Sequence, residues 1–253
     1  MTEIYDINDG KMRRFSRGRI VEHALIVVTF MILVVTGLSQ RFFYLDISQW
    51  FILKWGGIDS VRLIHRAAGA VFVAAAACHI VIAASGVILK RWQPSMIINM
   101  NDFTDAVHDM QYYIGLKNSP ARCDRYTYKQ KFEYWGILTG GLLMIGTGLV
   151  LWFPTQVVRS LPGELIPVAK ALHSNEAMVI VLLIAVWHIY NSIFSPEVFP
   201  LDTSIFTGYI SRERMIREHP LELLRRAGLA EEGSEAAHRE EREELKAGEA
   251  SPR

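Results

Sequence analysis

Five of the eight histidines lie in or at the edge of long apolar segments, where ionisable side chains are costly and mark functional sites. These are His23, His65, His79, His173 and His188. Imidazole is a common metal ligand, and imidazoles on facing helices of a bundle hold haem iron by one axial nitrogen each. The other three, His108, His219 and His238, stand in polar surroundings and are not expected to be ligands.

The spacing of these histidines predicts two levels of ligands. At 100° and 1.5 Å per helical residue, His65 and His79 are about 40° short of four full turns and about 21 Å apart. His173 and His188 are about 60° past four turns and about 22 Å apart. Each pair therefore shares one side of its helix, with one member near each end.

The elements that must position these residues are four apolar segments, each long enough to cross a hydrocarbon core that takes roughly 20 helical residues. They cover about 20–40, 63–89, 133–153 and 172–194. The first follows a basic segment and no small-residue cleavage site comes after it, so it is expected to be retained. The predicted fold class is an all-α integral membrane four-helix bundle with amphipathic loop helices.

The distribution of Lys and Arg predicts the orientation, because basic residues near spans stay on the cytoplasmic side. Residues 1–19 carry five of them, 90–131 seven, and the segment after 195 nine, whereas 41–66 and 159–170 together carry six. We therefore predict a multi-pass protein of a bacterial or archaeal cytoplasmic (inner) membrane, with both termini cytoplasmic.

In this orientation the second and fourth spans run in the same direction. His65 and His173 then lie near the outer face, while His79 and His188 lie near the cytoplasmic face, where His23 also enters the first span. We predict one b-type haem at each level, two in all. Glycines on the third span, at 140, 141, 146 and 148, offer a thin flank against which a macrocycle could lie.

The connecting segments carry weaker signals. Residues 102–117 suit an amphipathic helix lying on the membrane or against the bundle, and 155–170 is similar but broken by Pro162 and Pro167. We predict a four-helix transmembrane domain over 1–215 and a charged cytoplasmic tail over 216–253, disordered at its end.

Several chemistries are excluded. With two cysteines and no CxxCH motif, the chain has neither a c-type haem attachment site nor the ligands of an iron–sulfur cluster. It has no Walker loop, GxGxxG or HExxH motif, and nothing indicates a nucleic-acid partner.

Taken together, five stretches resemble a known family. They are RFSRGRIVEHALIVVTFMILVVTGL, RLIHRAAGAVF, RYTYKQKFEYW with IGTGLVLWFP, ALHSNEA and WHIYNSIF, in this order over about 13–215. The chain resembles the four-helix di-haem cytochrome b subunits that anchor formate dehydrogenases, thiosulfate reductases and nickel–iron hydrogenases.

The resemblance implies a set of haem ligands that differs at one position from the set that helical spacing suggests. It makes His65 and His173 ligands of the outer haem, and His23 and His188 ligands of the inner one. His79 is then an alternative to His23, a partner of a haem propionate, the ligand of a further haem, or a bystander. The choice between His23 and His79 stays open at this point.

The resemblance also implies a quinone site beside the inner haem, for menaquinone or ubiquinone. The matching stretch is RYTYKQKFEYW, with Tyr126, Thr127, Gln130 and Lys131 as polar candidates. Thr127 stands where relatives can carry Asn. Interfacial anchoring by Tyr, Trp and Lys is the plain structural alternative.

The sequence thus predicts a membrane electron-transfer subunit between a quinone site near the cytoplasmic face and a partner on the outer face. The partner would be an iron–sulfur, multihaem, molybdenum- or hydrogenase-type redox subunit, and membrane lipids surround the bundle. The direction of electron flow stays open, and any catalysis beyond quinone redox belongs to partners. A stand-alone transmembrane haem reductase and a histidine-lined metal transporter are the alternatives.

Overall fold

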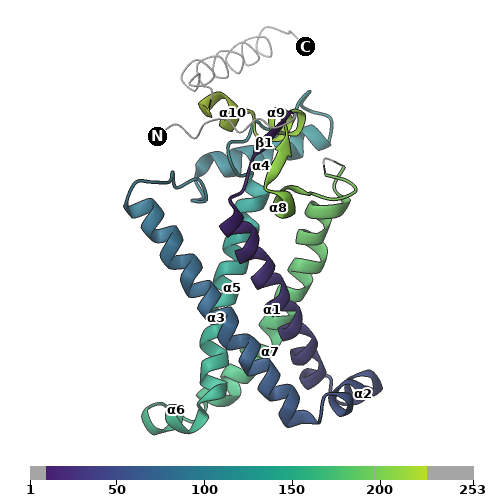
Figure 1. Ribbon diagram of the computed structural model, residues 1–253, viewed down its shortest axis with the longest axis vertical. Helices are drawn as coiled ribbons and strands as arrows, with labels where there is room; N and C mark the ends of the chain where they lie inside the picture. The colour runs from purple at the N-terminus through teal and green to yellow at the C-terminus, as the bar shows by residue number, and fades with distance from the viewer. Residues whose placement is uncertain (1–9, 197, 227–253) are drawn as a thin grey trace, which may run out of the picture. The chain divides into compact units, whose positions relative to one another are not determined.

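The computed structural model describes residues 10–196 and 198–226, and the elements in this range are almost entirely helical. Four helices are long and apolar enough to cross a membrane. They are α1 (Arg17–Arg41), α3 (Ile58–Ile88), α5 (Tyr128–Trp152) and the continuous helix Leu165–Phe194, which begins as α7 (Leu165–Leu182) (Figure 1). The predicted fold class, an all-α membrane bundle, is confirmed.

The remaining elements are short. They are α2 (Asp46–Lys54), α4 (Met100–Tyr113), α6 (Pro154–Ser160), α8 (Ser204–Thr207), α9 (Arg212–Glu218), α10 (Pro220–Arg226), and the paired strands β1 (Lys11–Arg13) and β2 (Tyr209–Ser211). The chain divides into two compact units. One, the bundle unit, comprises 13–93 and 133–209; the other, the loop unit, comprises the described parts of 1–12, 94–132 and 210–253.

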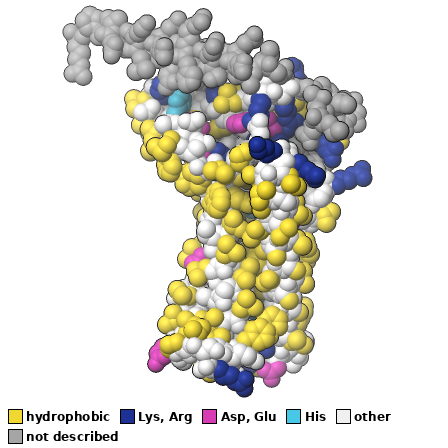
Figure 2. All heavy atoms as spheres, turned by 90° about the vertical axis from the view of Figure 1, so that its left-hand side faces the viewer, with side chains coloured by type: hydrophobic (Ala, Val, Ile, Leu, Met, Phe, Trp, Pro, Cys, Tyr) yellow, Lys and Arg dark blue, Asp and Glu magenta, His cyan; other side chains and the backbone are white. Residues whose placement is uncertain are grey.

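The bundle unit is packed as a membrane protein, with small and polar residues inside. The buried residues of α1 are Thr29, Thr36 and Ser39, and those of α3 include Ala68 and Ala75. Such residues let helix backbones approach closely, and α1 packs mainly against α3. Hydrophobic side chains instead cover the outer face of the bundle (Figure 2). This outward hydrophobic surface is what lipid requires.

All four spans begin earlier than the apolar pattern predicts. In the third and fourth spans the first turn is set by capping and by proline. The third begins at Tyr128 rather than 133, after the Thr127 cap described below. The fourth begins at Leu165 rather than 172 and contains Pro167. Proline is tolerated there since a first-turn N–H has no helical acceptor.

The fourth span changes its winding at its second histidine. After α7 it continues as two π-helical segments, η1 (Leu183–His188) and η2 (Tyr190–Phe194). The N–H of Ile189 donates to the carbonyl of Ile184, five residues back. A π turn holds more residues than an α turn, so each residue turns by less than 100°. The 60° offset expected between His173 and His188 is therefore reduced.

The loop unit has a small core of its own. Met12, Ile210 and Met215 are buried together. Glu222 is fully buried and accepts from Arg125 at 3.0 Å, and the buried His219 ring donates to the Asp124 carbonyl at 2.7 Å. Helices α9 and α10 fall in the predicted tail 216–253 and just before it, and 227–253 lies outside the described residues. The predicted boundary at 215 stays a prediction.

Candidate haem sites

The structure brings the rings of His65 and His173 together. His65 comes from α3 and His173 from α7, and their ring centroids are 6.4 Å apart with the ring planes at 75°. This pair unites two residues that the sequence analysis placed at one level from their positions in different spans.

Each of these rings is supported by a threonine on one of the other two spans: α1 for His65 and α5 for His173. Nδ1 of His65 lies 2.8 Å from the Thr36 hydroxyl on α1, and Nδ1 of His173 lies 2.9 Å from the Thr147 hydroxyl on α5. Each hydroxyl donates its one proton to a carbonyl of its own helix, at 2.6 Å from Thr36 to Ile32 and 2.8 Å from Thr147 to Leu143. The imidazoles must therefore donate from Nδ1, which leaves each Nε2 lone pair free for a metal.

A glycine follows each of these threonines and makes room for the ring. A Cβ placed on Gly37 would lie 3.3 Å from Cε1 of His65, and one on Gly148 would lie 3.2 Å from Cε1 of His173. Both distances are tighter than ordinary contact. The motif Thr-Gly-Leu, at 36–38 and again at 147–149, thus builds the same half-site on α1 and on α5. This repeat is visible in the sequence, but it was missed there.

The second pair is His23 and His188. Their ring centroids are 6.3 Å apart with the planes at 39°. Nδ1 of His188 makes a short hydrogen bond with the carboxylate of Glu133, from the first turns of α5. A carboxylate fixes Nδ1 as the protonated nitrogen and again leaves Nε2 free. The two pairs therefore differ in the chemistry that supports them: hydroxyls for His65 and His173, and a carboxylate for His188.

His79 lies apart from this pairing, because both of its ring nitrogens have protein partners. Nδ1 lies 2.5 Å from Oε1 of Glu22 and 3.0 Å from Nη1 of Arg19, and Nε2 lies 2.9 Å from the hydroxyl of Tyr134. Arg19 also forms an ion pair with Glu22 at 2.9 Å. His79 thus joins α3 to α1 and α5, and the ring facing His188 belongs to His23.

Both ring separations fit a bis-imidazole haem. A ligating nitrogen lies about 2 Å from its metal and about 1.2 Å in front of its ring centre, so two axial imidazoles should have centroids about 6.3 Å apart. The observed separations are 6.3 and 6.4 Å. Within residues 10–196 and 198–226, no group of three or more His, Cys, Asp or Glu side chains is arranged to hold a metal ion. Paired imidazoles suit haem, whose remaining iron ligands come from the porphyrin.

Comparison with known proteins identifies the family of the chain. The family model of prokaryotic cytochrome b561 matches residues 14–208. The chain belongs to the prokaryotic cytochrome b561 family. A similar protein is the cytochrome b556(Fdn) subunit of the nitrate-inducible formate dehydrogenase of Escherichia coli K12, 25% identical over 206 residues, covering 78% of this chain and 83% of that one. The cytochrome b556(fdo) subunit of formate dehydrogenase from the same strain is 22% identical over 210 residues, covering 82% and 89%.

Family membership implies b-type haem and electron transfer in a multi-pass bacterial membrane protein. The recognised resemblance to b-type cytochrome subunits of formate dehydrogenases is confirmed.

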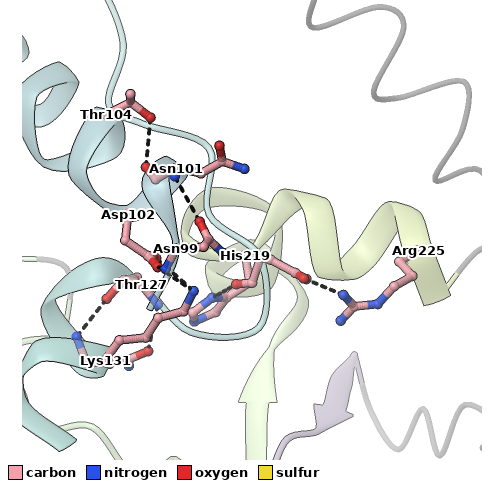
Figure 3. Close-up of polar contacts among 10 residues, drawn as sticks. Asn99, Asn101, Asp102, Thr104, Thr127, Lys131, His219 and Arg225 are labelled. Atoms are coloured by element: carbon pink, nitrogen blue, oxygen red, sulfur yellow. Dashed lines mark hydrogen bonds and ion pairs between the residues drawn. The ribbon is translucent and has the colours of Figure 1, made fainter. Parts of the chain in front are cut away.

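The quinone candidates of this b561-family chain have structural partners at the start of α5. The Thr127 hydroxyl accepts from the Gln130 N–H at 3.3 Å, and the Gln130 side chain accepts from the Thr127 N–H at 3.1 Å. This reciprocal pair is a capping box, which the T-x-x-Q spacing could have indicated. Lys131 is buried in an ion pair with Asp102 at 2.7 Å (Figure 3). The Arg125 guanidinium lies over the Tyr126 ring, 5.7 Å from its centroid.

The glycine flank expected on the third span has only one member against a candidate ligand. Gly148 touches His173, whereas a Cβ on Gly140 would meet Glu176 at 2.8 Å. Gly141 and Gly146 have no neighbouring atom within 4 Å of a built Cβ. Of these four glycines, Gly148 alone therefore makes room for a candidate ligand.

Proposed function

We propose that this chain carries two b-type haems and conducts electrons across the membrane between a quinone and a partner redox subunit. His65 and His173 ligate the outer haem, and His23 and His188 ligate the inner one. The observation that carries the proposal is the pair of ring separations, 6.4 and 6.3 Å, each supported by a hydrogen bond at a ligand Nδ1.

The two levels suit transfer across the bilayer. His173 and His188 lie on one continuous helix, and the fifteen residues from one to the other rise by at most about 22 Å, roughly two thirds of a hydrocarbon core of about 30 Å. A single histidine pair, holding one haem at one level, would reach only one face of the membrane. The uneven distribution of Lys and Arg supports placing the His23–His188 pair near the cytoplasmic side.

His79 serves as a structural link in this proposal rather than as a ligand. Its nitrogens bind Glu22 and Tyr134, and Glu22 directly precedes His23 in α1. The link therefore holds the first turns of α1 against α3 and α5 and orients the His23 ring toward His188.

The quinone is proposed to bind at the level of the inner pair. Glu133 on α5 contacts His188 of the inner pair. The stretch Tyr126–Lys131 precedes Glu133 by no more than seven residues, which is about two helical turns. Capping and ion pairing by Thr127, Gln130 and Lys131 support a role in shaping this end of the helix rather than in direct donation to a quinone.

The partner is proposed to be a redox subunit, because both relatives are named as cytochrome subunits of formate dehydrogenases. We place it on the opposite face, next to the His65–His173 pair. An iron–sulfur subunit is the simplest electron donor or acceptor for such an arrangement. Copurification of the full chain with larger redox subunits would distinguish this from a stand-alone reductase.

Haem counting in the purified protein tests the proposal. A pyridine haemochrome assay should give two haems per chain, with a dithionite-reduced α band at about 560 nm, and His65→Ala should retain one. Added menaquinol or ubiquinol should reduce the bound haem in proteoliposomes. A colourless protein would overturn the haem assignment, whereas a two-haem protein unresponsive to both quinols would overturn only the quinone site.

A further inference from the structure

Helix α4 turns its acidic side toward the protein and its apolar side outward. Asp102 and Asp109 are buried, with exposed fractions of 3% and 7%. Asp102 pairs with Lys131, and the Asp109 carboxylate accepts from the Ala121 N–H at 2.8 Å and lies 3.8 Å from Lys129 Nζ. In a water-soluble protein an amphipathic helix faces its core with the apolar side. Helix α4 does the opposite.

The outward side is a continuous apolar stripe. Its members follow the 3–4–3–4 spacing of one helix face and are between 49% and 75% exposed: Met100, Phe103, Val107, Met110 and Ile114. An exposed stripe of this length marks a surface that lipid or a partner covers. The ion pairs on the opposite side hold the helix in this orientation, so the exposure is built into the fold.

The stripe continues onto a membrane span. The ring of Phe103 meets the ring of Phe132 edge-on, with centroids 5.6 Å apart, and Phe132 is itself 41% exposed. Phe132 lies in the second turn of α5, one of the candidate spans. The apolar side of α4 thus meets an exposed apolar side chain at the start of a candidate span, which favours lipid as its occupant.

The connections and charges around α4 fit the same occupant. Residues 89–99 alone link α4 to the end of α3, and 114–127 link it to α5, so it is tethered to two spans at one membrane face. Basic side chains stand on both links, with Lys90 and Arg91 before α4 and Lys117 and Arg122 after it. Such residues attract anionic headgroups.

We propose that α4 is a membrane-surface helix, which inserts the stripe into the leaflet where α3 ends and α5 begins. Its apolar residues then lie about 5–10 Å below the headgroups, as in other interfacial helices. The acidic side stays above and binds Lys131 and Lys129, which ties the depth of α4 to the start of α5. This proposal does not depend on haem or quinone.

Spin labelling of the full, haem-loaded chain in phosphatidylethanolamine–phosphatidylglycerol vesicles tests the proposal. One nitroxide is placed at Val107, in the stripe, and a matched one at the exposed Asn101, about 140° around the helix from the centre of the stripe. Both use a Cys78→Ser, Cys123→Ser background whose haem spectrum is checked. At Val107, the collision rate of oxygen with the nitroxide should be several-fold higher than that of a water-soluble nickel chelate. At Asn101, the nickel chelate should have the higher collision rate.

Two results would overturn the proposal. Equal access of the nickel chelate to both positions would mean that the stripe lies in water, and exclusion of both reagents at Val107 would mean that protein covers it. If the cysteine-free background fails to fold, a photoreactive benzoylphenylalanine at Val107 in the native chain replaces the label. Lipid adducts are then expected, and protein cross-links in their place would contradict the proposal.

Discussion

Replacing Glu133 by Gln should raise the midpoint potential of the inner haem and leave that of the outer haem unchanged. The Glu133 carboxylate binds Nδ1 of His188, whereas the corresponding bonds of His65 and His173 go to neutral hydroxyls. An anion behind an axial ligand stabilises the ferric over the ferrous state. The amide oxygen that the substitution introduces could still accept the hydrogen bond, so Glu133→Gln removes the charge and keeps the geometry.

The expected magnitude follows from the distance. A hydrogen bond, an imidazole ring and a metal–nitrogen bond place the carboxylate about 7 Å from the iron. At an effective dielectric constant of about 20, a unit charge at this distance contributes about 2 kcal/mol. Since about 1.4 kcal/mol corresponds to 59 mV for one electron, the potential of the inner haem should rise by up to about 100 mV.

Potentiometric titration of the reduced α bands measures both haems in one experiment. Thr147→Val is the matched control. Thr147 lies on α5, as Glu133 does, and its substitution removes a neutral hydrogen-bond acceptor from His173. Its shift should fall on the outer haem alone and stay below about 40 mV, since a neutral hydrogen bond is worth about 1 kcal/mol. Equal shifts of both haems in Glu133→Gln, or no shift, would refute the reasoning.

Two further substitutions probe packing and pH dependence. Gly148→Ala should disturb the outer haem alone, lowering its occupancy or broadening its α band, because the new Cβ would lie 3.2 Å from His173; Gly146→Ala, with no atom within 4 Å, should leave the spectrum unchanged. Burial, together with Asp102 and Asp109, raises the pKa of Asp105 to about 6. The folded state is thus favoured at low pH and loses this contribution as pH rises through about 6. Asp105→Asn should therefore stabilise the protein by about 1 kcal/mol near pH 8, after allowance for solvent screening, and by little near pH 4, measured by thermal unfolding in detergent. A larger gain at the lower pH would contradict this sign.

The sequence was sufficient to predict the four spans and the pairing of His65 with His173. Apolar length determines the spans, and the position of each histidine along its span, together with the alternating direction of the spans, determines the pairing. The α5 and α7 starts were missed because a cap and a first-turn proline extend a helix beyond its apolar part.

The inner level could not be resolved in this way. His79 has suitable spacing on α3, but its nitrogens are bound by Glu22 and Tyr134 from two other helices, and only the assembled bundle shows this. The π-helical winding before His188 likewise has no marker in the residues LIAVWH. Two signals were legible and overlooked: the repeated Thr-Gly-Leu and the T-x-x-Q capping box.

The most direct test of the central claim is the haem content of His23→Ala compared with that of His79→Gln. The account predicts one haem per chain in His23→Ala and two in His79→Gln, because His23 faces His188 while His79 is bound by protein groups. Two haems in His23→Ala together with one in His79→Gln would contradict the proposed ligand set.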